Sequence, residues 1–198
     1  MKRWPLIPTI VVALAVATMI GLGLWQLLDR RPAKNAYLEQ LARNPAKPAI
    51  TFPRVSDDRL LFRRASADCV PPIALTLVGA GSFGFRILAE CGNGIPVQLG
   101  TTRDPKARIA WTGGTVTGFV SHAPDGRSVI GSLFDDSPKR MMLVLDRPPL
   151  GLSANPAPDT SAVPNSHLAY AGQWFFFALS AAVIYLLALR RRPATAPM

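Results

Sequence analysis

The sequence predicts a membrane α+β protein in which two transmembrane helices flank a small antiparallel β domain, a barrel or a sandwich. Apolar residues are concentrated in one long run at each end of the 198-residue chain. The region between the runs breaks into strand-sized apolar segments separated by turns rich in Gly and Pro. Only 17% of the residues are charged and 49% are hydrophobic, a composition that excludes long intrinsic disorder.

Two uncharged runs are predicted to span the membrane. Leu6–Leu28 is 23 residues long and Leu168–Leu189 is 22 residues long. At a rise of 1.5 Å per residue, each run can cross a hydrocarbon core of about 30 Å. Aromatic side chains typical of membrane interfaces accompany them: Trp4, Trp25, Tyr170, Trp174 and Tyr185. The first run exceeds the apolar core of a signal peptide, so we expect an uncleaved anchor.

Basic residues at the two ends predict the orientation. Lys2 and Arg3 precede the first span and Arg190–Arg192 follow the second, with no acidic residue beside either group. Short basic flanks stay in the cytoplasm, whereas long loops cross largely regardless of charge. We therefore expect both termini in the cytoplasm and the β domain in the periplasm. Residues 1–5 are too few for a mitochondrial presequence, which favours a bacterial inner membrane.

The net charge of +10 and the pI near 10.6 do not indicate a nucleic-acid partner. Half of the excess charge lies in the two terminal flanks. Between the spans, 17 basic residues face 12 acidic ones, so that region carries only +5. No basic stripe with interleaved aromatic residues is present.

The pattern divides the chain into seven segments. They are a cytoplasmic tail (1–5), a transmembrane helix (6–28), a juxtamembrane helix and linker (29–48), a periplasmic β domain (49–146), a Pro- and Ser-rich linker (147–166), a second transmembrane helix (167–189) and a basic cytoplasmic tail (190–198). Arg30-Arg31-Pro32 breaks the apolar run at the expected membrane surface. The spacing of Tyr37, Leu38 and Leu41 then predicts a short amphipathic helix over Ala33–Arg43.

Seven strand-like runs are expected in the β domain. They are Leu60–Arg64, Ile73–Val78, Phe85–Cys91, Ile95–Leu99, Thr115–His122, Ser128–Leu133 and Met141–Leu145.

A glycine-rich segment invites a nucleotide-binding interpretation. Gly79-Ala80-Gly81-Ser82-Phe83-Gly84 fits the G-x-G-x-x-G pattern and follows a strand-like run, with Arg103-Asp104 at the distance of a ribose-binding residue. The residues after it predict turns and strands rather than alternating helices and strands. A glycine-rich hairpin is therefore favoured, and a nucleotide-binding enzyme is a minor alternative.

Cys69 and Cys91 face the oxidising side in this topology, so a disulfide and two buried free thiols are both open. Their spacing does not match a Cys-x-x-Cys redox or copper-relay pair. His122, just before Pro124-Asp125-Gly126, is interpreted as a turn residue. Ser, His and Asp form no recognisable nucleophile motif, so hydrolase chemistry is not indicated.

The start of the second span carries a candidate ligand. On a helix, His167, Tyr170, Ala171 and Trp174 lie at i, i+3, i+4 and i+7, which is one face. An imidazole at the membrane boundary, with aromatic rings deeper, can ligate a flat apolar cofactor. On this chemistry alone, an interfacial aromatic belt with a snorkelling histidine is the simpler interpretation.

Motifs at both ends carry a family resemblance. Pro164-Asn165-Ser166-His167-Leu168-Ala169-Tyr170-Ala171 with Trp174-Phe175, and Gly23-Leu24-Trp25-Gln26-Leu27, resemble the C- and N-terminal signatures of the Surfeit locus protein 1 family. Shorter segments resemble its β-domain blocks: Gly84–Ile87, Val97–Gly100, Trp111 and Gly113–Gly118. The chain departs from the family at three places. The arginine usually found four residues after the tryptophan is replaced by Asp29, with Arg30 one residue later. Leu99-Gly100-Thr101 replaces an Arg-Gly-Trp, and Phe134–Pro164 is shorter than usual.

The resemblance implies a non-enzymatic assembly factor for cytochrome c oxidase that assists haem a delivery or insertion into subunit I. It makes His167 the candidate ligand of the haem iron and Tyr170, Trp174, Trp25 and Gln26 candidate pocket residues. The expected partners are oxidase subunit I and a haem a donor enzyme. The outer end of the first span, at Trp25 and Gln26, is expected at about the same membrane depth as His167 at the start of the second span. The two helices are therefore expected to frame one site. The alternative function is a membrane-tethered β domain that binds proteins without a cofactor.

Overall fold

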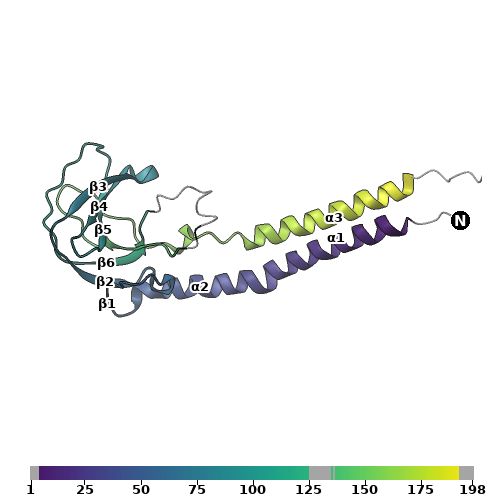
Figure 1. The fold of residues 1–198 in the computed structure, drawn as a ribbon, viewed down its shortest axis with the longest axis horizontal. Coiled ribbons are helices and arrows are strands. Elements are labelled where there is room, and N and C mark those ends of the chain that lie inside the picture. Colours follow the sequence, from purple (N-terminus) through teal and green to yellow (C-terminus); the bar gives the residue numbers. More distant parts are fainter. Residues whose placement is uncertain (1–4, 125–134, 136, 192–198) are drawn as a thin grey trace, which may run out of the picture. The chain divides into compact units, whose positions relative to one another are not determined.

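The computed structural model describes residues 5–124, 135 and 137–191, which form two units (Figure 1). The helical unit combines the residues up to Tyr37 with those from Val163 onward, and the β unit comprises Leu38–Ala162. The predicted class, a membrane α+β protein, is confirmed: apolar helices at both ends of the chain flank a sheet domain.

The helical unit is an antiparallel pair. Helix α1 (Leu6–Trp25) packs along α3 (His167–Arg191), as Figure 1 shows. Both are long and apolar enough to cross a membrane, and many of their large apolar side chains are exposed in the protein alone. Such uncovered apolar surface is typical of helices in contact with lipid. The chain is therefore a membrane protein.

Small residues and one polar pair hold α1 against α3. Ala171 and Ala178 are buried, and Thr9 Oγ1 lies 2.6 Å from the Tyr185 hydroxyl oxygen. A Cβ atom on Gly23 would lie 2.7 Å from a ring carbon of Phe175, so any larger residue here must displace that ring. Close packing of small residues and interhelical hydrogen bonds are the usual means by which helices associate in lipid.

Gly23→Ala is expected to destabilise the helix pair by about 1–3 kcal/mol, because the added methyl group overpacks the contact with Phe175. Gly21→Ala is the matched control, since a Cβ there meets no atom within 4 Å. Alanine favours a helix by up to about 1 kcal/mol over glycine, so the control should be neutral or slightly stabilising. Thermal unfolding in detergent measures both. Equal melting temperatures for the two variants would contradict the close packing.

The helix continues beyond the predicted membrane surface. The apolar run ends at Arg30-Arg31-Pro32, but the backbone stays helical there, because the π turn η1 (Gln26–Arg30) leads directly into α2 (Arg31–Arg43). In a regular α-helix, a proline ring clashes with the carbonyl group four residues earlier. Here the hydrogen bonding shifts by one residue just before Pro32, since the Arg31 N–H binds the Gln26 carbonyl oxygen. The widened turn accommodates the proline, and the amphipathic helix predicted over Ala33–Arg43 is confirmed within α2.

The β unit contains one mixed seven-stranded sheet in the order β1-β2-β6-β7-β5-β4-β3. The strands are β1 (Ile50–Thr51), β2 (Arg64–Cys69), β3 (Ala74–Gly79), β4 (Phe85–Glu90), β5 (Pro96–Thr102), β6 (Gly114–His122) and β7 (Met141–Leu145). The β1–β2 and β5–β7 pairs are parallel and the other neighbours are antiparallel, so the prediction of an antiparallel domain is wrong for these two pairs. Among the described residues the sheet has two ends, β1 and β3, so hydrogen bonding does not close it into a barrel.

Most predicted strands are confirmed with small shifts at their ends. The strand predicted at Leu60–Arg64 is wrong, because Asp57 caps a 3-10 turn there, η3 (Asp58–Leu60). The adjacent β2 was not predicted, since its buried side chains are small and alanine is a weak strand former. The run Ser128–Leu133 lies outside the described residues.

The core of the β unit forms around β5 and β7. Its fully buried side chains include Leu41 from α2 and Val97, Leu99, Val120 and Leu143 from the strands. The following chain, predicted as a linker, packs against β5. Ser153 exchanges two backbone hydrogen bonds with Thr101, at 2.9 and 3.0 Å, and Asn155 accepts from the buried Gln98 side chain at 2.7 Å.

The η3 turn carries a pH-dependent cap. The Asp57 carboxylate accepts from the Arg59 side chain at 2.9 Å and from its backbone N–H at 3.0 Å. These two bonds lower the pKa of Asp57 below its ordinary value of 3.8. The cap therefore contributes fully to stability at any pH above the pKa that Asp57 has in the unfolded chain. The contribution is lost as the pH falls through the lower pKa that Asp57 has in the folded protein. An NMR titration should give an Asp57 midpoint below 3.8 that rises in Arg59→Gln. An unchanged midpoint in Arg59→Gln would refute this cause.

Candidate functional site

The first residue of α3 contacts the first residue of the π turn. His167 Nδ1 lies 2.7 Å from Gln26 Oε1. An amide oxygen only accepts hydrogen bonds, so Nδ1 carries the proton and donates it to Gln26. In the neutral ring the lone pair then belongs to Nε2, the nitrogen available to a metal. Ligand histidines in metalloproteins are commonly oriented in this way, by an acceptor on the second ring nitrogen.

A second polar pair joins the same two parts of the helical unit. Asn165 Nδ2, just before α3, donates to Asn35 Oδ1 on α2 at 2.9 Å. Together with the His167–Gln26 bond, it joins the start of α3 to the helical run that follows α1. The sequence did not indicate the Asn35 contact, because nothing in a single asparagine's surroundings identifies a partner 130 residues away.

The aromatic candidates have other ring partners. Trp174 meets the Phe177 ring edge-on, with centroids 6.4 Å apart. The Arg30 guanidinium lies 5.2 Å from the centre of the Trp25 ring, and Trp25 is 46% exposed. Tyr170 is 51% exposed and lies one turn after His167 in α3. The structure therefore joins His167 directly to Gln26 and places Tyr170 and Trp174 further along the same helix face.

The π turn explains how Arg30 reaches Trp25. In an α-helix the residue above position i is i+4, whereas in a π turn it is i+5. Arg30 follows Trp25 by five residues and lies over its ring through the η1 turn. Arg30 lies one residue later in the sequence than the arginine usual in the family, and the wider turn still brings it over the Trp25 ring. Single π turns often mark functional sites in helices.

The donor set limits the kind of metal this chain can hold. Among the described residues, no three His, Cys, Asp or Glu side chains cluster as metal ligands. A haem iron does not need such a cluster, because the porphyrin supplies most of its ligands. One imidazole with an oriented Nε2, aromatic rings on the same helix and an exposed arginine are the groups that fit a haem.

The glycine-rich segment is not a nucleotide site. Gly79 ends β3, which pairs antiparallel with β4, and the intervening helix η4 (Gly81–Phe83) has only three residues. A dinucleotide loop lies between a strand and a full helix of a parallel βαβ unit. The nucleotide-binding alternative is therefore wrong, and the segment is a hairpin connection.

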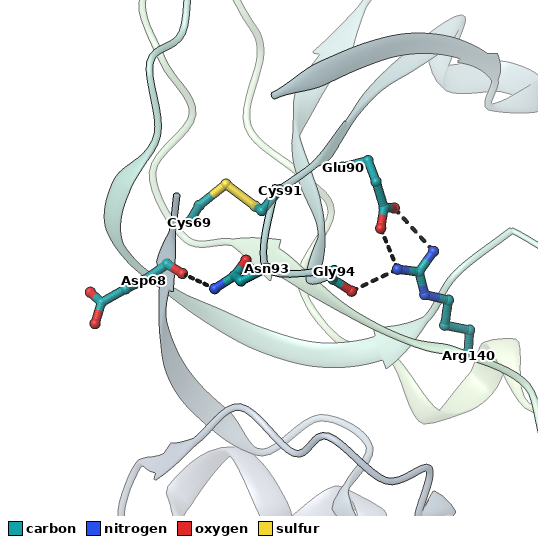
Figure 2. Close-up of a disulfide and its surroundings, with 7 residues drawn as sticks. All are labelled: Asp68, Cys69, Glu90, Cys91, Asn93, Gly94 and Arg140. Carbon is teal, nitrogen blue, oxygen red and sulfur yellow. Dashed lines mark hydrogen bonds and ion pairs between the residues drawn. A yellow bond between two sulfur atoms is a disulfide. The ribbon is translucent and has the colours of Figure 1, made fainter. Parts of the chain in front are cut away.

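Cys69 and Cys91 are joined by a disulfide in the β unit (Figure 2). Their Cα atoms are 5.2 Å apart, and both residues are buried. The bond connects the end of β2 to the end of β4, which are not neighbours in the sheet, so the sheet curls back on itself at this corner. One polar contact of the next turn reinforces it, since Asn93 Nδ2 donates to the Asp68 carbonyl oxygen at 2.7 Å. Nearby, Arg140 pairs with Glu90 and donates to the Gly94 carbonyl oxygen.

His122, interpreted from the sequence as a turn residue, is the last residue of β6, and its Nε2 lies 2.8 Å from Asp58 Oδ1. The pair joins the end of a strand to the η3 turn. This is a structural contact of the β unit.

Comparison with known proteins decides the family. The SURF1 family model matches residues 13–179, from the first apolar helix through the β unit into the second helix. The chain belongs to the SURF1 family. This SURF1 chain carries all its candidate residues, Trp25 to Trp174, inside the matched range. The SURF1 family is associated with cytochrome c oxidase assembly. No curated protein and no solved structure matches the chain.

Proposed function

We propose that this SURF1 protein assists assembly of cytochrome c oxidase at a bacterial inner membrane by holding haem a for insertion into subunit I. The single observation that supports the proposal most directly is the His167–Gln26 hydrogen bond between the two apolar helices. It leaves one oriented imidazole nitrogen free for an axial metal bond. Haem a would come from a donor enzyme and leave to subunit I.

Each residue of the site has a distinct role in this proposal. When bound, haem a would supply an iron centre that an imidazole nitrogen can ligate. His167 Nε2 would be that ligand, and Gln26 would orient the ring by accepting a hydrogen bond from Nδ1–H. Trp174 and Tyr170 offer apolar ring surface on the same helix face. Arg30, held over Trp25, offers a cation for the haem carboxylates.

The orientation belongs to the same proposal. The basic flanks Lys2-Arg3 and Arg190–Arg192 favour cytoplasmic termini and a periplasmic β unit. An alkaline phosphatase fused into the central region should then be active. An inactive phosphatase there, with activity at a terminal fusion, would reverse the topology.

Deletion of the gene tests the function. We expect membranes to lose most of the haem a absorption and oxidase activity while haem a synthesis continues, with recovery on re-expression of the full chain. Unchanged haem a content and oxidase activity under several growth conditions would refute the proposal.

A second function, a membrane-tethered module that binds proteins without a cofactor, is favoured by one observation: the sheet ends in an open apolar strand, β3. The two functions separate in cells that cannot make haem a. A cofactor-independent module should still recover oxidase subunits from detergent extracts of those cells, whereas a haem carrier should lose that association.

A further inference from the structure

Strand β3 is an open end of the sheet. It pairs with β4 on one side, and Figure 1 shows it as the outermost strand. In an antiparallel pair, only every second residue of a strand forms backbone hydrogen bonds with the neighbouring strand. Ala80 is one of these residues, because its N–H binds the Gly84 carbonyl oxygen at 2.7 Å. The backbone groups of Leu75, Leu77 and Gly79 therefore point away from β4. In the part of the chain that the structure describes, no other backbone segment binds them.

This edge lacks the features that usually protect edge strands. Proteins shield such edges with charged residues, proline, bulges or very short strands. β3 has six residues, Ala-Leu-Thr-Leu-Val-Gly, with neither a charge nor a proline, and Leu75 is 38% exposed. The opposite edge, β1, has only two residues. An unprotected apolar edge is typical of a strand that pairs with another chain.

An apolar groove with one cation runs beside the open edge. The groove has a volume of about 280 Å³ and is lined by Leu75, Thr76, Leu77, Ile87 and Ala107–Ile109. Leu75 and Leu77 pair with Ala89 and Ile87 on β4, so their side chains share one face of the sheet with the buried Ile87. Arg108 in this lining has no ion-pair partner among the described residues.

The charges around the groove favour an acidic occupant. The segment 103–109 holds Arg103, Lys106 and Arg108 against one acid, Asp104, whose carboxylate already accepts the Lys106 backbone N–H at 2.8 Å. The groove lining includes no acidic residue. A second copy of this chain would bring another uncompensated Arg108 and another net charge of +10 to the contact.

We infer that β3 is the docking edge for an extended segment of a partner protein that has alternating apolar side chains and a flanking carboxylate. The segment adds to the sheet as a further strand through the outward backbone groups of Leu75, Leu77 and Gly79. Its apolar side chains enter the groove, and its carboxylate pairs with Arg108. This is β-strand addition, in which main-chain hydrogen bonds supply affinity and side-chain pockets supply specificity.

Two synthetic peptides test the inference on the full chain in detergent micelles. Both carry a fluorophore and a Thr-Val-Thr-Val-Thr-Val core, one with Glu and the other with Lys at each end. By fluorescence anisotropy we expect the Glu peptide to bind at least tenfold more tightly than the Lys peptide. The backbone amides of Leu75 and Leu77 should exchange hydrogen more slowly when the Glu peptide is present.

Three variants make the test specific. Leu77→Pro removes one outward N–H while sparing the ladder with β4, and should abolish binding. Val55→Pro, at an 80% exposed loop position, is the matched control and should bind normally. Arg108→Glu leaves the strand unchanged and should reverse the preference between the two peptides.

Four outcomes would overturn the inference. They are equal binding of the two peptides, retained binding in Leu77→Pro, an unchanged preference in Arg108→Glu, and a dimer by sedimentation that Leu77→Pro dissociates. The last outcome would assign the edge to a second copy of the chain. The measurement contains no haem, so its failure leaves the haem proposal standing, and failure of the haem proposal does not affect it.

Discussion

His167→Ala is expected to remove most of the haem a that co-purifies with the protein from cells that make haem a. The substitution removes the imidazole whose Nε2 is the candidate iron ligand, together with its hydrogen bond to Gln26. The apolar helices and the β unit do not depend on this side chain, so membrane insertion and the Cys69–Cys91 disulfide should persist. The absorption spectrum of the purified protein measures haem content, and protease protection measures insertion.

Two further variants are expected to weaken haem binding less than His167→Ala does. Gln26→Leu keeps the ligand but removes the acceptor of its Nδ1 proton, and should weaken haem affinity by about 10- to 100-fold. Tyr170→Phe retains the ring and loses only the hydroxyl, so its effect should be the mildest of the three. A wild-type haem content and spectrum in His167→Ala would show that His167 is not the ligand, and the pocket assignment would fail with it.

Replacing both Cys69 and Cys91 with serine is expected to destabilise the β unit by about 3 kcal/mol, the loop-closure term for a bridge spanning 22 residues. The bridge joins β2 to β4, between which three other strands lie in the sheet order, so no strand ladder joins them; one backbone hydrogen bond, from the Gly92 N–H to the Val70 carbonyl oxygen at 2.7 Å, lies beside the bridge. Guanidinium unfolding of the full chain in detergent, followed by near-ultraviolet circular dichroism, measures the change.

The matched control for the disulfide is wild-type protein unfolded with and without a reductant. Reduced wild-type protein should unfold close to the double-serine variant, and the oxidised protein at a clearly higher denaturant concentration. Identical midpoints for oxidised and reduced protein would contradict a stabilising role. The serine variant should retain the His167–Gln26 pair, because the two sites lie in separate units of the chain.

The helices were predictable because their signal is local. Twenty or more apolar residues without a charge meet one physical requirement, the thickness of a bilayer, and no distant residue alters it. The strands β3 to β7 were predictable for a related reason, since their apolar residues form short runs ended by Gly, Pro and Asn. β2 was not predicted, because small residues at alternate positions are as typical of a loop as of a strand, and only the structure shows that they are buried.

The sequence also identified both partners of the central site, His167 and Gln26, through two motifs. It could not show that they touch, because a hydrogen bond between residues 141 positions apart depends on how the helices pair. The helices approach closely at Gly23, where the Phe175 ring lies against the backbone, and no periodicity reports that contact. The sequence also could not show that Arg30 lies over the Trp25 ring. That contact depends on the π turn, which is formed by the backbone hydrogen bonding just before Pro32.

By itself, then, the sequence determined the membrane spans, most strands, the family resemblance and the candidate ligand, all of which depend on residue type and short-range spacing. The tertiary structure alone decided that the disulfide forms, that the glycine-rich segment is a hairpin, and that β3 lies at an open end of the sheet. These features depend on strand order and on distances between residues remote in the chain. They are set by the packing of the whole β unit, which no local pattern encodes.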